Sequence, residues 1–152
     1  MIRDRQHSVR QAATVVECAF ILPLTFFLLF SLIVGSMGVF RYQETAMLAR
    51  EGARYASTHG YQFRKDQGMA MGTANEWSQD IYTNGVAPLM VALDPSRVSY
   101  SVAWPDVINQ SGKPDNWPGS KVDVTVSYTW FPEMYLVGPL TLTSTSSMPI
   151  TN

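Results

Sequence analysis

The sequence has only one cysteine, Cys18, among 152 residues. A single cysteine excludes an intramolecular disulfide and a metal cage built from cysteine thiolates. A carboxylate, Glu17, stands directly before it, which does not fit the small-residue context of a lipid-attachment motif. We therefore interpret Cys18 as a small hydrophobic residue within an apolar segment.

The chain also lacks an excess of charge of either sign, with eleven Lys and Arg against twelve Asp and Glu. Its basic residues are scattered, whereas a nucleic-acid surface requires them to be clustered. The two histidines, His7 and His59, are too far apart in the sequence to suggest a shared metal. Phosphate-binding glycine loops, nucleophile elbows and paired catalytic carboxylates are missing from the sequence as well. The sequence predicts neither an enzyme nor a cofactor, metal or nucleic-acid partner.

What the chain does contain is an uncharged run from Cys18 to Phe40. About twenty-three residues make roughly 35 Å of helix, enough to cross a hydrocarbon core of about 30 Å. A signal peptide has a shorter apolar region and a small-residue cleavage site, whereas this run passes directly into Arg41. We expect the run to remain as a membrane anchor, followed by one small domain of about 110 residues.

Around this run we predict one long helix from about Ala12 to Ser57, because the segment after the run lacks proline and favours helix. Pro23 lies inside the helix and should kink it, since it cannot donate a hydrogen bond to the carbonyl four residues earlier. Basic residues are nearly balanced on the two sides of the run, so charge alone does not orient it. The predicted parts are a basic leader, the membrane-spanning part of the helix and a domain after it, at residues 1–11, 12–40 and 41–152.

Small side chains follow one face of the predicted helix at steps of three or four residues, interrupted only by a tyrosine. Close helix packing in membranes uses such residues, and we predict contact with another subunit over Ser31, Gly35 and Gly38. The part from Ala46 to Ala56 has two interpretations, packing on the chain's own sheet or contact with another helix. The whole series is Ser31, Gly35, Gly38, Tyr42, Ala46, Ala49, Ala53 and Ala56.

The remainder predicts an α+β domain with a short second helix and a three-stranded antiparallel sheet. Thr73 and Glu76 form a capping-box pattern that starts the second helix after a polar loop over residues 60–72. After a turn at Asp94, apolar and polar residues alternate, which is typical of half-buried strands. The predicted strands cover residues 98–104, 122–130 and 140–147.

Two stretches of the sequence resemble TadE-like proteins. Ala12 to Pro23 reads AATVVECAFILP, in which small residues lead to Val-Glu, an apolar stretch and a Leu-Pro step. Ala49 to Ala56 reads AREGARYA and is similar to the helical motif that follows the span in that family. The residues of this motif are Arg50, Glu51, Gly52, Ala53 and Arg54.

The resemblance implies a pseudopilin-type structural component of a Tad (tight adherence, Flp) pilus assembly system, with a pilin-like fold. It also implies a single pass through the bacterial inner membrane, with the N-terminus inside and the C-terminus outside. The implied partners are other pilin or pseudopilin subunits, the membrane assembly platform, the lipid bilayer and a prepilin peptidase. Whether the subunit enters the pilus, as a minor pilin or at its tip, is left open.

In pilin-like proteins a prepilin peptidase cuts after a glycine, and a glutamate lies five residues into the mature chain. The resemblance therefore implies a candidate cleavage site between Ala12 and Ala13, although Ala12 stands where glycine is usual. Independently of the family, a carboxylate at the edge of an apolar span needs a cationic or hydrogen-bonding partner. Glu17 then either binds the N-terminal amine of a neighbouring subunit or lies in the headgroup zone, solvated or paired with Arg10.

The tryptophans support an alternative function, a membrane-tethered binding module in which the span is only an anchor. Trp104 and Trp130 fall on the apolar strand faces, so we expect them in the core. Trp117 lies in a loop rich in proline and glycine and is the better candidate for contacting a ligand such as a surface polysaccharide. Changes at Glu17 or in the small-residue series would impair assembly under the first function and leave ligand binding intact under the second.

Overall fold

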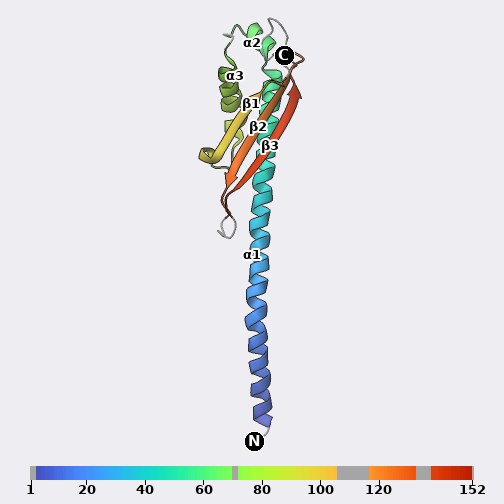
Figure 1. The fold of residues 1–152 in the computed structure, drawn as a ribbon, viewed down its shortest axis with the longest axis vertical. Helices are drawn as coiled ribbons and strands as arrows, with labels where there is room; N and C mark the ends of the chain where they lie inside the picture. Colours follow the sequence, from blue (N-terminus) through green and yellow to red (C-terminus); the bar gives the residue numbers. More distant parts are fainter. Residues whose placement is uncertain (1–2, 70–71, 106–116, 133–137, 152) are drawn as a thin grey trace. The chain divides into compact units, whose positions relative to one another are not determined.

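A computed structural model describes the backbone of residues 3–69, 72–105, 117–132 and 138–151, and within these ranges the side chains from residue 14 onward (Figure 1). The chain forms two compact units, residues 1–37 and 38–152. Helices and three strands make up the described part. In chain order they are α1 (Arg3–Thr58), α2 (Tyr61–Asp66), α3 (Ala74–Asp80), η1 (Ile81–Val86), η2 (Ala87–Leu89), η3 (Pro95–Arg97), β1 (Val98–Ala103), β2 (Lys121–Trp130) and β3 (Leu140–Pro149).

The first helix, α1, confirms the prediction of one long helix through the apolar run and the segment after it. It starts at Arg3, closer to the N-terminus than the predicted Ala12, because the sequence before Pro23 contains no glycine or proline that would interrupt it. Pro23 itself lies inside the helix, which continues to Thr58. The apolar run and the motif helix are therefore parts of one element.

The segment after α1 is more helical than the predicted polar loop, because α2 covers Tyr61–Asp66. This short stretch contains no glycine or proline, and the Gln62 amide donates a hydrogen bond to the Asp66 carboxylate one turn later, at 2.9 Å. Gly68 follows with a φ of +65°, a left-handed conformation that favours glycine and ends the helical turn.

The start of α3 confirms the predicted capping box. The Glu76 amide donates to Thr73 Oγ1 at 3.4 Å, and the Thr73 amide donates to Glu76 Oε2 at 2.6 Å. Beyond Asp80 the chain continues in helical turns of different pitch, first η1 and then η2, rather than in a separate α-helix. These turns carry the buried side chains of Ile81 and Val86 towards α1.

Removal of the cap should weaken this corner of the domain. We expect Thr73→Ala to lower the free energy of unfolding by about 1 kcal/mol, because the Glu76 amide at the helix start loses the hydroxyl that accepts its hydrogen bond. Thr73→Ser keeps the hydroxyl and serves as the matched control. Urea unfolding of the full chain in detergent, followed by tryptophan fluorescence, measures the difference; equal midpoints for the two variants would contradict it.

The sheet is antiparallel with strand order β1-β2-β3, as predicted (Figure 1). Val98 of β1 pairs with Tyr128 of β2, and Tyr128 pairs with Leu142 of β3. One face of β2 is fully buried and the other is half-buried, in strict alternation. On the second face hydroxyl groups bond across the strands, with 2.8 Å between the side-chain oxygens of Thr125 and Thr145. The buried residues of β2 are Val122, Val124, Val126, Tyr128 and Trp130.

The core of residues 38–152 lies where the buried face of β2 meets α1. Leu48 is fully buried, and the alanines that precede and follow Gly52 on the same face of the helix are buried as well. A Cβ atom on Gly52 would lie 3.1 Å from Cγ1 of Val124, so helix and strand approach closely there. The alternative left open for Ala46 to Ala56 is therefore resolved in favour of packing within the chain. The buried alanines are Ala46, Ala49, Ala53 and Ala56.

Candidate functional site

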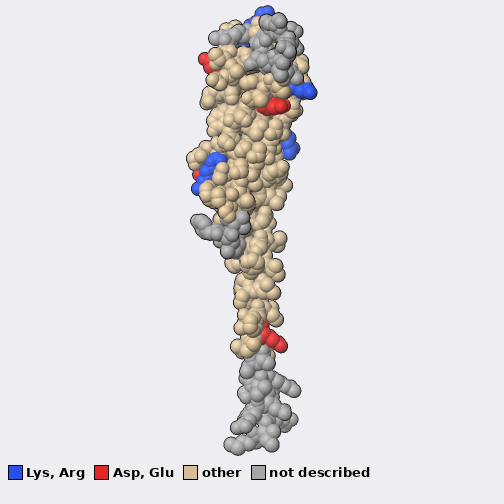
Figure 2. Space-filling model, in the orientation of Figure 1, with Lys and Arg blue, Asp and Glu red and all other residues tan. Residues whose placement is uncertain are grey.

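The apolar part of α1 is a candidate membrane span by its length and composition. Its most apolar 18-residue window has a mean hydropathy of 2.5, and none of that window is buried by the rest of the chain. The face displayed in Figure 2 shows an uncharged surface along this part of the helix. Three hydroxyl groups in the span donate to carbonyl oxygens of the preceding helical turn, which hides them from an apolar surrounding. The apolar side chains of such a helix are more favourable in an apolar environment than in water, and its polar groups are already hydrogen-bonded within the helix.

Four of the residues predicted for assembly or processing lie in the first compact unit, residues 1–37, and the structure describes their side chains. Glu17 is exposed on the helix surface, and Pro23 lies inside the helix. The hydroxyl of Ser31 donates to the Phe27 carbonyl at 2.8 Å and so has a partner within its own helix. Gly35 is open, because no heavy atom lies within 4 Å of the place a Cβ would take.

The candidate cleavage residues Ala12 and Ala13 fall within the helical backbone of α1. Their side chains lie outside the described residues. The cleavage prediction therefore stays a prediction.

Gly38 has a role within the chain that the sequence did not indicate. A Cβ atom at this position would lie 2.6 Å from Cζ3 and 2.9 Å from Cη2 of Trp130, whose indole is only 6% exposed. The helix can pass the indole only because position 38 has no side chain. Gly38 therefore gives no independent support for contact with another subunit, in contrast to Gly35.

The motif over residues 50–54 divides into a buried half and an exposed half. Gly52 and Ala53 face the core, and a Cβ on Gly52 would meet Cγ2 of Val86 at 2.9 Å. Arg50 and Arg54 point outwards, and the Arg54 guanidinium lies 3.7 Å from the half-exposed carboxylate of Glu51. An exposed pair of this kind adds at most a few tenths of a kcal/mol. The motif thus combines a packing requirement with an accessible set of charges.

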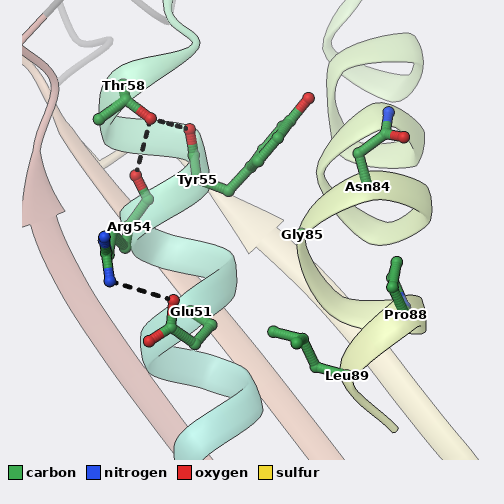
Figure 3. Close-up of a pocket in the computed structure, with 8 residues that line it drawn as sticks. All are labelled: Glu51, Arg54, Tyr55, Thr58, Asn84, Gly85, Pro88 and Leu89. Atoms are coloured by element: carbon green, nitrogen blue, oxygen red, sulfur yellow. Dashed lines mark hydrogen bonds and ion pairs between the residues drawn. The ribbon is translucent and has the colours of Figure 1, made fainter.

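Glu51 and Arg54 of the motif border a shallow cavity of about 290 Å³ between α1 and the η1 and η2 turns (Figure 3). At its floor Gly85 approaches the ring of Tyr55 so closely that a Cβ would lie 2.9 Å from the tyrosine Cβ. The residues that line it are Glu51, Arg54, Tyr55, Thr58, Asn84, Gly85, Pro88 and Leu89. This set offers contacts for a partner but no nucleophile with an adjacent base.

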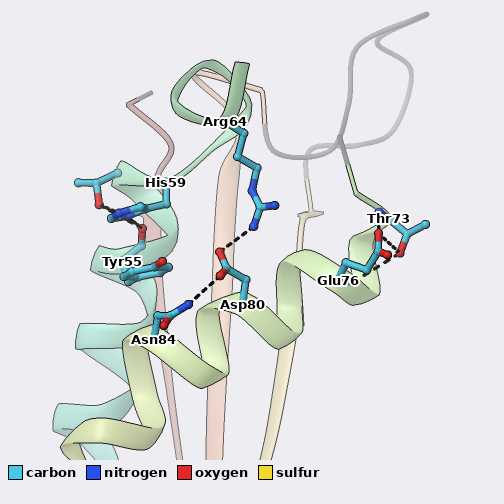
Figure 4. A network of polar contacts seen from close by, with 8 residues as sticks. Tyr55, His59, Arg64, Thr73, Glu76, Asp80 and Asn84 are labelled. Atoms are coloured by element: carbon cyan, nitrogen blue, oxygen red, sulfur yellow. Dashed lines mark hydrogen bonds and ion pairs between the residues drawn. The ribbon is translucent and has the colours of Figure 1, made fainter. Parts of the chain in front are cut away.

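A second group of polar contacts ties α2 and α3 together (Figure 4). The Arg64 guanidinium donates to Asp80 Oδ2 at 2.6 Å, and the Asn84 amide donates to Asp80 Oδ1 at 2.8 Å. Beside them the rings of Tyr55 and His59 stack with centroids 3.9 Å apart. Burial raises the pKa of Tyr55 above its ordinary value, and the nearby carboxylate of Asp80 adds to this rise.

This second group holds α2, α3 and η1 together. Within the described ranges, no group of three or more His, Cys, Asp or Glu side chains lies close enough to hold a metal ion. The ion pair between Arg64 and Asp80 joins residues sixteen positions apart on different helices, so no local sequence pattern could have indicated it.

The tryptophans follow their predicted places only in part. Trp130 is buried, and Trp104 is half-buried with its ring 6.1 Å from that of Trp77. Trp117 is half-buried too, with its ring centroid 5.0 Å from that of Tyr61. Trp117 therefore packs against the first residue of α2, which leaves less of its ring for a ligand than the sequence suggested.

The comparisons with known proteins concern the N-terminal part of the chain. The family described as TadE-like protein matches residues 9–54, which contain the apolar span and end in the motif helix. No curated protein and no solved structure gives a significant match. The resemblance expected from the sequence is confirmed for this part, because residues 9–54 are similar to TadE-like proteins.

Proposed function

We propose that the chain is a membrane-anchored structural pseudopilin of a Tad pilus assembly system. The TadE-like family suggests involvement in Tad pilus assembly. The observation that carries the proposal is that the matched residues 9–54 are one continuous helix, apolar in its first part and built into a folded domain in its last part. A helix of this kind anchors the domain and presents its free apolar surface to lipid or to other helices.

The proposed topology is a single pass through the bacterial inner membrane, with the leader inside and the domain outside. Basic residues stand on both sides of the span, but those after it belong to a domain of more than a hundred residues. Long domains are translocated largely regardless of their charge, so the short basic leader has the greater weight. This supports an N-in, C-out arrangement.

The proposed assembly contacts lie on the span. Gly35 is open for close approach by another helix, and Ser31 next to it is small and already hydrogen-bonded. Glu17 is exposed at the start of the uncharged run, where a cationic partner such as the N-terminal amine of a neighbouring subunit would neutralise it. The proposed partners are other pilin or pseudopilin subunits, the membrane assembly platform and, for cleavage between Ala12 and Ala13, a prepilin peptidase.

The proposal is tested by site-specific photocrosslinking from Leu32 in cells that assemble Tad pili. We expect Gly35→Leu and Glu17→Gln each to reduce crosslinks to pilin-like subunits about tenfold, the equivalent of about 1.4 kcal/mol per contact. Ile33→Leu keeps an apolar side chain in the span and is the matched control.

One outcome of this experiment would contradict the proposal. Wild-type crosslinking and piliation by both variants, with normal membrane insertion, would overturn the assembly role of the span. The intact mass of the membrane-extracted protein reports processing separately, because removal of residues 1–12 is a large change in mass.

A further inference from the structure

The exposed apolar side chains of the folded unit gather at one end of it. Among the described residues from 38 onward, nine large hydrophobic side chains are exposed, and Met69 alone belongs to the opposite end, beside α2. Seven of the others lie towards the end where α1 enters the unit, Leu89 adjoins them on the side of the cavity in Figure 3, and we name these eight the base patch. They are Val39, Phe40, Tyr42, Met47, Leu89, Val91, Phe131 and Leu140.

One side of the base patch is a groove between α1 and the segment after η2. Phe40, Met47, Leu89 and Val91 line about 320 Å³ of space, together with Gln43 and Glu44. The Glu44 carboxylate binds this segment to the helix, because its Oε1 accepts hydrogen bonds from the amides of Val91 at 3.1 Å and Ala92 at 2.9 Å. Val91 is held there with 90% of its surface exposed.

The other side of the base patch is formed by the lower end of the sheet. Phe131 follows the indole that covers Gly38, and Leu140 pairs with Trp130 in the ladder. The Arg97 guanidinium lies 4.9 Å from the centroid of the Phe131 ring and also contacts Asp94, at 3.5 Å. An arginine in such a place can cover apolar surface with its aliphatic stem while its charged end stays in the polar layer between membrane hydrocarbon and water.

The exposed apolar side chains lie on several sides of α1, which favours contact with lipid over contact with a single partner helix. At 100° per residue, Val39, Phe40 and Tyr42 point in widely separated directions around the helix axis. A partner helix would need a stripe on one side, whereas lipid surrounds the helix from all sides.

The position of the base patch along the helix agrees with this reading. Phe40 ends the uncharged run, and Met47 lies seven residues later, about 10 Å further along the helix. A bilayer has about 30 Å of hydrocarbon within about 40 to 45 Å in total, so each headgroup layer is about 5 to 8 Å thick. When the run crosses the hydrocarbon, the base patch therefore falls within and directly above the headgroup layer.

We propose that the base patch is seated in the headgroup layer of the same membrane that the span crosses, with Val91 inside this layer. The folded unit then rests on the bilayer instead of being held above it in water. This inference depends on the membrane span and not on the role in pilus assembly.

Spin labels on single cysteines test the proposal in the full chain carrying Cys18→Ser. Val91→Cys is the test position, and Met69→Cys is the matched control, since Met69 is an exposed apolar side chain at the opposite end of the unit. Leu28→Cys, in the span, verifies insertion. The protein is reconstituted into vesicles of phosphatidylethanolamine and phosphatidylglycerol, and collision rates with oxygen and with a water-soluble nickel chelate are measured.

We expect the label at position 91 to be severalfold less accessible to the chelate than the label at position 69, and severalfold more accessible to oxygen. Equal chelate access at positions 91 and 69, with position 28 shielded, would overturn the proposal. Nanodiscs holding one copy each distinguish lipid from a second copy: shielding that persists supports lipid, and shielding that appears only with several copies overturns the proposal.

Discussion

Gly52→Leu should lower the free energy of unfolding of the folded domain by about 3 kcal/mol, because it forces a large side chain into a filled core. A Cβ at this position already meets Cγ2 of Val86 at 2.9 Å and Cγ1 of Val124 at 3.1 Å. Both neighbours are fully buried and cannot move aside without opening the contact between helix and sheet. Urea unfolding of the full chain in detergent, followed by tryptophan fluorescence, measures the loss.

Gly35→Leu is the matched control for this prediction, since it makes the same change in the same helix where no atom lies within 4 Å. It should leave the unfolding midpoint of the domain unchanged, and its effect should be confined to assembly. A similar midpoint for Gly52→Leu and the wild type would show that the approach of α1 to η1 and β2 is looser than described.

The second large effect concerns Gly38 and Trp130, and it should appear as a strong coupling between two substitutions. Gly38→Leu pushes a side chain into the indole and should cost about 2 kcal/mol. Trp130→Leu removes most of a buried ring and should cost about 3 kcal/mol. Because the smaller side chain at position 130 makes room for one at position 38, the double variant should recover at least about 1 kcal/mol relative to the sum.

The same unfolding measurement determines all four corners of this cycle. Gly35→Leu combined with Trp130→Leu is the control, because position 35 has no described neighbour outside its own helix turn and should behave additively. Additivity for the pair Gly38 and Trp130 would contradict the direct contact.

The parts of the fold that could be predicted are those determined by local sequence. The apolar run and the absence of proline after it were enough to predict α1, and alternation along β2 predicted which side chains are buried. Thr73 and Glu76 predicted the start of α3, because a capping box involves residues only three positions apart.

The contacts that could not be predicted join residues far apart in the chain. Gly38 looked like one more member of a small-residue series, and only the fold shows that the ring of Trp130 occupies the space beside it. The amides of Val91 and Ala92 donate hydrogen bonds to the Glu44 carboxylate across more than forty residues of sequence. These bonds depend on how the segment after η2 positions its backbone against α1. For the site, the sequence indicated the motif at residues 50–54 but not its division into buried and exposed halves.

The end of β3 has a consequence for the order in which the protein can fold. Ser57 at the end of α1 donates a hydrogen bond to the Pro149 carbonyl at 2.6 Å, across 92 positions of sequence, and the Thr151 amide donates to the Ser57 carbonyl at 2.9 Å. Closing such long loops is slow and comes late in folding. During synthesis, a nascent chain that contains only α1, β1 and β2 still lacks the last strand of its sheet. The end of α1 therefore gains these two partners only after residues 149–151 have been synthesised.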